Sequence, residues 1–274
     1  MVQKNSLKRA TVFLGGGRIT SALIAGLRLG GYQREIVVYD RNPARLRALQ
    51  RESSVEIARD LKSIIERTEM LILAVRPPSI SGLLDEISAT GALPDLGISL
   101  AAGIPIAILR RRMKSVPWVR AMPSPVCRIG RGLTAVSFDR AVSKQQRSRV
   151  REFFANLGQV LELPERGFDT FTATYSSSHG YHALETLAFA AHRAGLDQKT
   201  ALIAATHALA DGIQYWRDSG LRLHELLHEA ATPGGIAAAT MAAMDNAGYR
   251  RAVLKGIQAG VAQAIRNAKQ VVSR

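Results

Sequence analysis

Residues 11–26, which read TVFLGGGRITSALIAG, decide the fold. An apolar run typical of a buried strand ends in three glycines, and apolar residues at helical spacing follow. A glycine turn between a strand and a helix lets the backbone approach a pyrophosphate, whose charge the N–H groups at the helix N-terminus can meet. This stretch therefore predicts a dinucleotide-binding unit.

The glycines match the G-x-G-x-x-G pattern in part. Gly15 and Gly17 occupy its first two glycine positions, and Thr20 stands at the third, where helix and strand pack closely. The pattern gains weight because a strand, a turn and a helix surround it. A glycine-rich turn that binds no ligand is the alternative.

A second strand is predicted over residues 35–40, EIVVYD, which end in Asp40. Asp40 follows Thr20 at about the 20-residue spacing at which an acidic side chain accepts hydrogen bonds from the ribose hydroxyls of NAD. It could instead cap a turn or helix ahead of Asn42 and Pro43.

Arg41 and Arg45 leave the choice of cofactor open. Either guanidinium could pair with the extra phosphate of NADP, which the Asp40 carboxylate would repel. We therefore predict NADH or NADPH as the cofactor, with Asp40 favouring NADH.

The chain of 274 residues is long enough for a large core divided between a cofactor domain and a second domain. Its formal net charge of +15 can indicate a nucleic-acid partner. The basic residues are spread along the chain, however, and the densest group, Arg110 to Arg112 with Lys114, ends a predicted helix. We therefore expect an anionic cofactor and a small-molecule carboxylate substrate, and no nucleic acid.

No apolar run reaches the roughly 18 residues of a membrane span. Glycines and Arg18 interrupt the apolar run near the N-terminus before it could act as a signal-peptide core, so we expect a cytoplasmic protein with no membrane partner. Cys127 is the single cysteine, which excludes an intramolecular disulfide or a cysteine-based zinc cluster. We interpret it as a small apolar filler.

Apolar strands alternate with helical patterns up to residue 163, which is typical of a mostly parallel sheet covered on both faces. The predicted strands are 11–14, 35–39, 70–75, 97–100, 118–121, 134–137 and 158–163. After Pro164 the chain becomes rich in Ala and Leu, which predicts helices only. The predicted fold is therefore α/β, with a Rossmann-like doubly wound sheet in residues 1–163 and an all-α domain in residues 164–274.

The predicted helices of the second domain carry alanine on nearly every face, as in residues 183–191 and 201–210. Helices that are apolar all round are expected to be buried. We therefore expect a homodimer or a higher homo-oligomer, in which another subunit covers them.

Five blocks, in order along the chain, resemble the pyrroline-5-carboxylate reductase family. They are FLGGGRITSALIAGL near the start, LILAVRPP at 71–78, SLAAGIP at 99–105, VRAMPSPVCRIGRGLTAV at 119–136 and ATPGGIAAATM at 231–241. The resemblance implies a Rossmann domain followed by a helical dimerisation domain. It also implies hydride transfer from NAD(P)H to a cyclic imine carboxylate, with conversion of pyrroline-5-carboxylate to proline as the leading expectation.

By matching position, the resemblance also implies the cofactor contacts. Gly15, Gly17 and the backbone at Arg18 and Ile19 would face the pyrophosphate. The adenosine ribose would lie between Asp40 and Arg41. The rest of the implied site consists of Ala74, Val75 and Pro77 along the nucleotide, Ala102 and Gly103 near the nicotinamide, and Pro123 closing the pocket.

The implied substrate loop departs from the family pattern. In the family, a loop of Ser-Gly-Ser-Gly-Pro type opens a helix and holds the substrate carboxylate; the aligned residues here are Tyr175, Ser176, Ser177, Ser178 and His179. Hydroxyls ahead of a helix, together with its free N–H groups, can bind a carboxylate. A polar N-cap of the helix predicted over 177–194 is the alternative.

A second family motif is Pro-Gly-Gly followed by two small residues, which commonly include a Thr that faces the imine nitrogen. Pro233, Gly234 and Gly235 are present, but Ile236 and Ala237 follow, so the hydroxyl donor is absent. Imine reduction needs a hydrogen-bonded or positive nitrogen, and a positioned acid is worth roughly 10²–10⁴ in rate. Another side chain must supply the proton.

The candidate proton donors are His179, Tyr181 and Thr232, with Tyr175 and His182 as further possibilities. We favour His179 or a tyrosine hydroxyl, because these residues lie in or next to the substituted loop, and histidine suits proton donation near neutral pH. The alternative for His179 is a partly buried packing residue.

Residues 224–228, HELLH, fit the helical zinc motif H-E-x-x-H. No third ligand is evident nearby in the sequence, so we expect no metal. The leading hypothesis is an imine reductase, including a relative that acts on another imine or keto acid. The alternative is a nucleotide-binding relative that has lost catalysis and acts in regulation, which the missing hydroxyl at Ala237 motivates.

Overall fold

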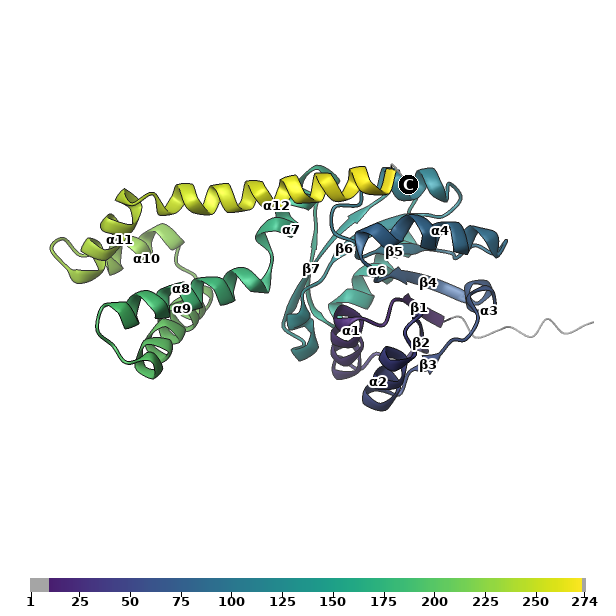
Figure 1. Cartoon of the computed structure of the whole chain (residues 1–274), viewed down its shortest axis with the longest axis horizontal. Helices are drawn as coiled ribbons and strands as arrows, with labels where there is room; N and C mark the ends of the chain where they lie inside the picture. Colours follow the sequence, from purple (N-terminus) through teal and green to yellow (C-terminus); the bar gives the residue numbers. More distant parts are fainter. Residues whose placement is uncertain (1–9, 273–274) are drawn as a thin grey trace, which may run out of the picture. The chain divides into compact units, whose positions relative to one another are not determined.

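The computed structural model describes residues 10–272, which form two compact units (Figure 1). The first unit extends to Tyr175 and takes in the chain again from Gly260. The second unit is Ser176–Ala259. Helix α12 (Tyr249–Val272) begins in the second unit and ends in the first.

Within the described residues, the first unit is built on an eight-stranded sheet in the order β3-β2-β1-β4-β5-β6-β7-β8. Neighbouring strands are parallel, except that β6 and β7 are antiparallel. The strands are β1 (Ala10–Leu14), β2 (Ile36–Tyr39), β3 (Glu56–Ile57), β4 (Thr68–Leu73), β5 (Gly97–Ser99), β6 (Trp118–Met122), β7 (Gly132–Phe138) and β8 (Gly158–Glu162). Strand β1 pairs with β2 on one side and with β4 on the other, so the strand order reverses at β1.

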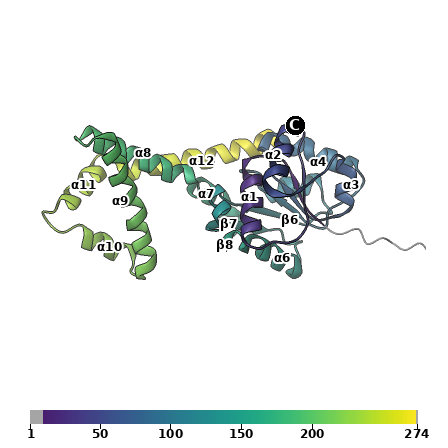
Figure 2. The ribbon, with the colours of Figure 1, turned by 90° about the horizontal axis from the view of Figure 1, so that it is seen from below.

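Helices cover both faces of this sheet (Figures 1 and 2). Successive side chains of a strand point to opposite faces, so Val12 and Leu14 of β1 enter one core and Phe13 enters the other. The first core is closed by α3 (Leu61–Glu66), α4 (Ile80–Ala89), α5 (Ile106–Arg112) and the end of α12. The second is closed by α1 (Arg18–Leu29), α2 (Pro43–Ser53) and α6 (Lys144–Ala155).

Local sequence explains where these helices begin. The Asn42 side chain accepts hydrogen bonds from the Ala44 and Arg45 N–H groups, and Pro43 takes the first helical position of α2. At α6, Ser143 and Gln146 form a reciprocal capping box. The first unit ends with the short helix α7 (Phe168–Thr174), which follows the 3₁₀ turn η3 (Glu165–Gly167).

The second unit contains helices only, as predicted. They are α8 (Ser177–Arg193), α9 (Gln198–Ser219), α10 (Leu223–Ala230), α11 (Ile236–Asn246) and the start of α12, and α8 packs along α9. Among the described side chains of this unit, Ala201 and Ala205 are the buried ones. Large apolar side chains remain exposed, among them Phe189, Leu202, Ile203, Ile213, Tyr215, Trp216 and Ile236.

The predicted fold class is confirmed, with every predicted strand present in the sheet. Strand β3 is an addition that the sequence patterns did not indicate, because two residues carry no readable alternation. The compact units differ from the predicted division after residue 163: α7 and the end of α12 belong to the first unit, since Phe168 and Val271 are buried there. In the part of the chain that the structure describes, no helix combines the length and apolar composition that crossing a membrane requires.

Candidate functional site

A cavity of about 940 Å³ opens at the carboxyl ends of β1, β2 and β4, where the strand order reverses. Ligands of doubly wound folds bind at such a switch point. Its lining consists of Leu14, Gly15, Gly17, Arg18, Ile19, Tyr39, Asp40, Arg41, Asn42, Pro43, Arg45, Ala74, Val75, Arg76, Ser79 and Leu83. Most of the predicted cofactor residues are therefore brought together at one place.

The glycine turn between β1 and α1 is held by contacts that require its glycines. Gly15 has a φ of 110°, and a Cβ added there would lie 2.6 Å from the Ala74 carbonyl oxygen. The buried Thr20 hydroxyl donates to the Gly15 carbonyl at 2.5 Å, so the residue at the third glycine position stabilises the turn. Gly17 is different, because no protein atom lies within 4 Å of an added Cβ. The turn thus leaves an open cradle in front of α1, which fits a diphosphate.

Asp40 both lines the cavity and braces the turn. Its Oδ2 accepts a hydrogen bond from the Gly16 N–H at 2.6 Å, and its Oδ1 accepts from the Asn42 N–H at 2.7 Å. Its side chain is 10% exposed. Asp40 therefore has the turn-capping role that was one of the two predicted alternatives. For the other, each carboxylate oxygen keeps a lone pair that a ribose hydroxyl could use.

The two arginines beside Asp40 are already paired. Arg45 Nη1 lies 3.6 Å from Asp40 Oδ2, and Arg41 forms an ion pair with Glu86 of α4. Both arginines are more than half exposed and line the cavity. An incoming phosphate would compete with carboxylates for them, whereas a ribose hydroxyl would leave these pairs intact.

The remaining predicted cofactor residues lie outside this cavity, at the same edge of the sheet. Pro77 follows β4, Ala102 and Gly103 follow β5, and Pro123 follows β6. Because β4, β5 and β6 are parallel, their carboxyl ends lie along one edge. These residues therefore lie along the same edge of the sheet, at increasing distance from the glycine turn in the strand order.

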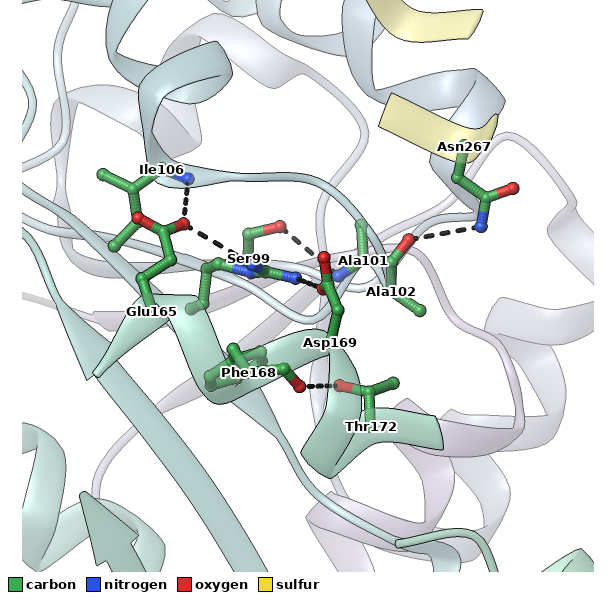
Figure 3. A network of polar contacts seen from close by, with 10 residues as sticks. Ser99, Ala101, Ala102, Ile106, Glu165, Phe168, Asp169, Thr172 and Asn267 are labelled. Carbon is green, nitrogen blue, oxygen red and sulfur yellow. Dashed lines mark hydrogen bonds and ion pairs between the residues drawn. The ribbon is translucent and has the colours of Figure 1, made fainter. Parts of the chain in front are cut away.

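An ion-pair network around the buried Arg120, which the sequence patterns did not indicate, lies close to the β5 end (Figure 3). Arg120 of β6 is 2% exposed at its side chain; its Nη2 donates to Asp169 Oδ1 at 2.6 Å, and its guanidinium lies 4.4 Å from the Phe168 ring centre. Glu165 Oε1 lies 3.5 Å from Arg120 Nη1 and accepts a hydrogen bond from the Ile106 N–H at 2.6 Å. The available signal was a charged residue inside the strand pattern WVRAM.

The predicted substrate loop spans the end of the first unit and the start of the second. Tyr175 belongs to the first unit, where its Oη accepts a hydrogen bond from the Leu133 N–H at 2.8 Å. Ser176 precedes α8, and its side chain accepts no hydrogen bond from the backbone N–H groups of the helix. Its Oγ lies 2.6 Å from Oγ of Ser178, the second residue of α8. Ser177 begins α8, and the His179 N–H in its first turn donates to the Ser176 carbonyl at 2.9 Å.

The other predicted substrate and catalytic residues are also in the second unit. Thr232 accepts a hydrogen bond at its carbonyl from the Gly235 N–H at 2.9 Å, which closes the turn through Pro233 and Gly234 ahead of α11. Ile236, the first residue of α11, is 88% exposed. Tyr181 and His182 are exposed on α8, and Tyr181 borders a groove against α9.

Two other sequence features have local structural roles. The motif at 224–228 lies on α10, and Glu225 accepts from the Arg222 guanidinium and the Arg222 N–H, which lowers the pKa of its carboxyl. Among the described residues no group of three or more His, Cys, Asp or Glu side chains is placed to hold a metal ion. Cys127 is buried, and desolvation raises the pKa of its thiol to about 11, as expected for an apolar filler.

Comparisons with known proteins match both halves of the chain. The family model described as NADP oxidoreductase coenzyme F420-dependent matches residues 11–103, and that described as pyrroline-5-carboxylate reductase dimerisation matches residues 165–267. The pyrroline-5-carboxylate reductase of Thermus thermophilus is 31% identical over 253 residues, which cover 90% of this chain and 94% of that protein. The one from Synechocystis sp. is 28% identical over 250 residues, covering 90% and 93%.

Solved structures agree with the fold. The 1-pyrroline-5-carboxylate reductase of Streptococcus pyogenes has a TM-score of 0.84 at 24% identity, covering 94% of this chain and 98% of that one. The pyrroline carboxylate reductase of Plasmodium falciparum, solved with NADP bound, has a TM-score of 0.83 at 18% identity, covering 96% and 99%.

Replacing Gly17 by Val tests the cradle. Its φ of −81° suits any residue and the space in front of it is open, so the variant should fold, but the added side chain would occupy the diphosphate position. We expect the Kd for NADH and NADPH, measured by titration, to rise at least about 10-fold, or about 1.4 kcal/mol. Gly82→Val, at an exposed glycine of α4 with equally open surroundings, should bind as the unmodified chain does. An unchanged Kd for Gly17→Val would show that the turn holds no diphosphate.

Proposed function

Because the chain belongs to the pyrroline-5-carboxylate reductase family, we propose that it reduces a cyclic imine carboxylate, pyrroline-5-carboxylate in the first instance, to proline with NADH or NADPH. The observation that carries the proposal is the open cradle at Gly17 in a cavity at the switch point of the sheet. The same chain continues into the region that matches the dimerisation model.

The reaction converts a C=N bond into a C–N single bond. The reduced nicotinamide supplies a hydride to the imine carbon, and a proton reaches the nitrogen. Asp40, Gly15, Gly17 and the N-terminus of α1 would hold the adenosine and diphosphate part of the cofactor. The carboxyl ends of the parallel strands β4 to β6 would hold the remaining part, the nicotinamide, at the edge of the sheet.

The substrate carboxylate is assigned to the serine loop ahead of α8. Ser176, Ser177 and Ser178 place hydroxyls at this helix end, and the absence of a side-chain cap from Ser176 leaves helix N–H groups available to an anion. The turn of Pro233, Gly234 and Gly235 ahead of α11 is the second part of the proposed substrate site. The functional division of the chain into a cofactor region and a substrate and dimerisation region follows from this assignment.

The imine nitrogen needs a proton donor, and Ala237, at the position where the family commonly has a Thr, has no hydroxyl to provide one. Another side chain must therefore donate the proton. We assign this role to His179, with Tyr181 and Thr232 as the other candidates. His179 lies in the first turn of α8, next to the proposed carboxylate site, and its side chain is exposed. Thr232 has its carbonyl in the turn ahead of α11, and its Oγ1 lies close to Gly235.

Association of identical subunits is the third element of the proposal. The dimerisation match covers residues 165–267, and the second unit of a single chain exposes many large apolar side chains, such as Phe189 and Trp216. A homodimer, or a higher homo-oligomer, would cover them.

Mixing the purified chain with pyrroline-5-carboxylate and NADH or NADPH should cause loss of the absorbance of the reduced cofactor. Asp40 favours NADH, so we expect the higher kcat/KM with NADH. The departures at His179 and Ala237 make a relative with another imine or keto acid the second candidate. Turnover with one of those compounds only would select it. Measurable cofactor binding without turnover on any of them would select a regulatory relative that has lost catalysis.

His179→Ala should lower kcat by about 100-fold if this side chain delivers the proton. The matched control is His207→Ala, since His207 is also an exposed helical histidine and pairs with Asp211 of its own helix α9. The control should keep its kcat. If the His179→Ala variant were fully active, His179 would not be the proton donor, and Tyr181 or Thr232 would take its place as the candidate.

In sedimentation at micromolar concentration the full chain should form a dimer or a larger species, because its exposed apolar helices are stabilised by burial. A single monomeric species at that concentration would contradict the proposed assembly.

A further inference from the structure

The loop of residues 100–105, which joins β5 to α5, follows the strand next to β4, at whose end the cavity stops. The cavity extends from the end of β2 across β1 to the end of β4, and β5 is the next strand in the sheet. If the adenosine lies at Asp40 and the diphosphate at Gly17, the nicotinamide is left to the β5 side. This step rests on the proposed function.

One side of the 100–105 loop is fixed by the end of α12. The Ala102 carbonyl accepts a hydrogen bond from Asn267 Nδ2 at 3.4 Å (Figure 3). Gly103 has a φ of 78°, and a Cβ there would lie 2.5 Å from the Ala264 carbonyl oxygen. Because Ala264 and Val271 of α12 are buried, the loop backbone packs against a fixed surface on this side.

The other side is fixed by Glu165. Ile106 follows the loop directly and is the first residue of α5. Its N–H donates a hydrogen bond of 2.6 Å to Glu165 Oε1 (Figure 3). A hydrogen bond to an ionised acceptor is roughly twice as strong as one between neutral groups. Glu165 therefore fixes the point at which the loop becomes a helix.

Arg120 in turn holds Glu165 in place. Its guanidinium is held by the ion pair with Asp169 and by the Phe168 ring, both on α7. The Glu165 carboxylate therefore pairs with a cation whose position is fixed. Removing Arg120 would leave carboxylates without their buried partner and disturb the fold. Glu165 is 36% exposed, so its own replacement is tolerated more easily.

We propose that Glu165 is a positioning residue for hydride transfer, which acts through the Ile106 N–H to hold the 100–105 loop beside the nicotinamide. Hydride transfer needs the reacting carbons about 3–3.5 Å apart, and a displacement of about 1 Å can cost about 100-fold in rate. A loop fixed at both ends keeps the ring in one orientation. A loop that has lost its hydrogen bond at Ile106 allows the nicotinamide ring several orientations.

The role depends on an oxygen acceptor and not on the negative charge alone. Glu165→Gln keeps an amide oxygen for the Ile106 N–H, whereas Glu165→Ala removes the acceptor. The matched control is Glu162→Ala on β8, because Glu162 is a similarly exposed glutamate whose ion-pair partners, Arg147 and Arg151, lie on α6 and not at the loop.

The variants are compared as full chains by three measurements. These are kcat under saturating substrate, the Kd for ADP-ribose, which lacks the nicotinamide ring, and the fluorescence of bound NADH or NADPH. For Glu165→Ala we expect kcat to fall by about 10-fold, the Kd for ADP-ribose to stay unchanged and the fluorescence enhancement on binding to decrease. Glu165→Gln should restore most of kcat and of the enhancement, and Glu162→Ala should match the unmodified chain.

Three results would overturn the proposal. The first is an unchanged kcat and fluorescence in Glu165→Ala. The second is an equal loss in Glu165→Gln and Glu165→Ala, which would assign the effect to charge. The third is a parallel loss of ADP-ribose binding, which would assign it to general damage. The fluorescence measurement does not need turnover, so a chain that reduces no imine would refute the proposed function while leaving the role of Glu165 open to direct measurement.

Discussion

The first unit depends on a close backbone approach at the turn between β1 and α1. Gly15 adopts a φ of 110° and packs against the Ala74 carbonyl, a position that no side chain could occupy. Two further contacts hold the same turn: Asp40 accepts from the Gly16 N–H, and the Thr20 hydroxyl donates to the Gly15 carbonyl. Strands β2 and β4 and helix α1 thereby fix one loop from three directions, which leaves Gly17 open to the cavity.

The same principle, a loop held from elements distant in sequence, recurs at the end of β5. Asn267 and Ala264 come from the last helix, and Glu165 comes from the turn after the sheet. Arg120, whose charge is buried at the sheet, holds the Glu165 side chain in place, since a buried charge is costly to separate from its partners. The strand ends thus form a rigid edge where the cofactor is proposed to bind, and the residues proposed for the substrate lie at the start of α8 and in the turn ahead of α11, in the other unit.

Much of the fold was predictable because its signals are local. The glycine turn and the strand alternation occupy short windows, and the strands predicted from them all occur in the sheet. The same windows also supply residues that line the cavity, since Gly15, Gly17 and Asp40 lie at adjacent strand ends. Strand β3 was missed because two residues show no periodicity, and the Arg120 network was missed because its partners lie more than 40 residues away.

The sequence by itself determined the α/β class, the glycine turn between β1 and α1 and the change to an all-helical region, because hydrophobic periodicity and glycine placement act within one or two elements. It also determined the family, through five ordered blocks. Only the tertiary structure decided that Asp40 braces the turn it faces, that α7 and the end of α12 belong with the sheet, and that Glu165 supports the loop after β5. Each of these three features depends on contacts between residues far apart in the sequence, and the packing of the whole unit determines which of those residues come into contact.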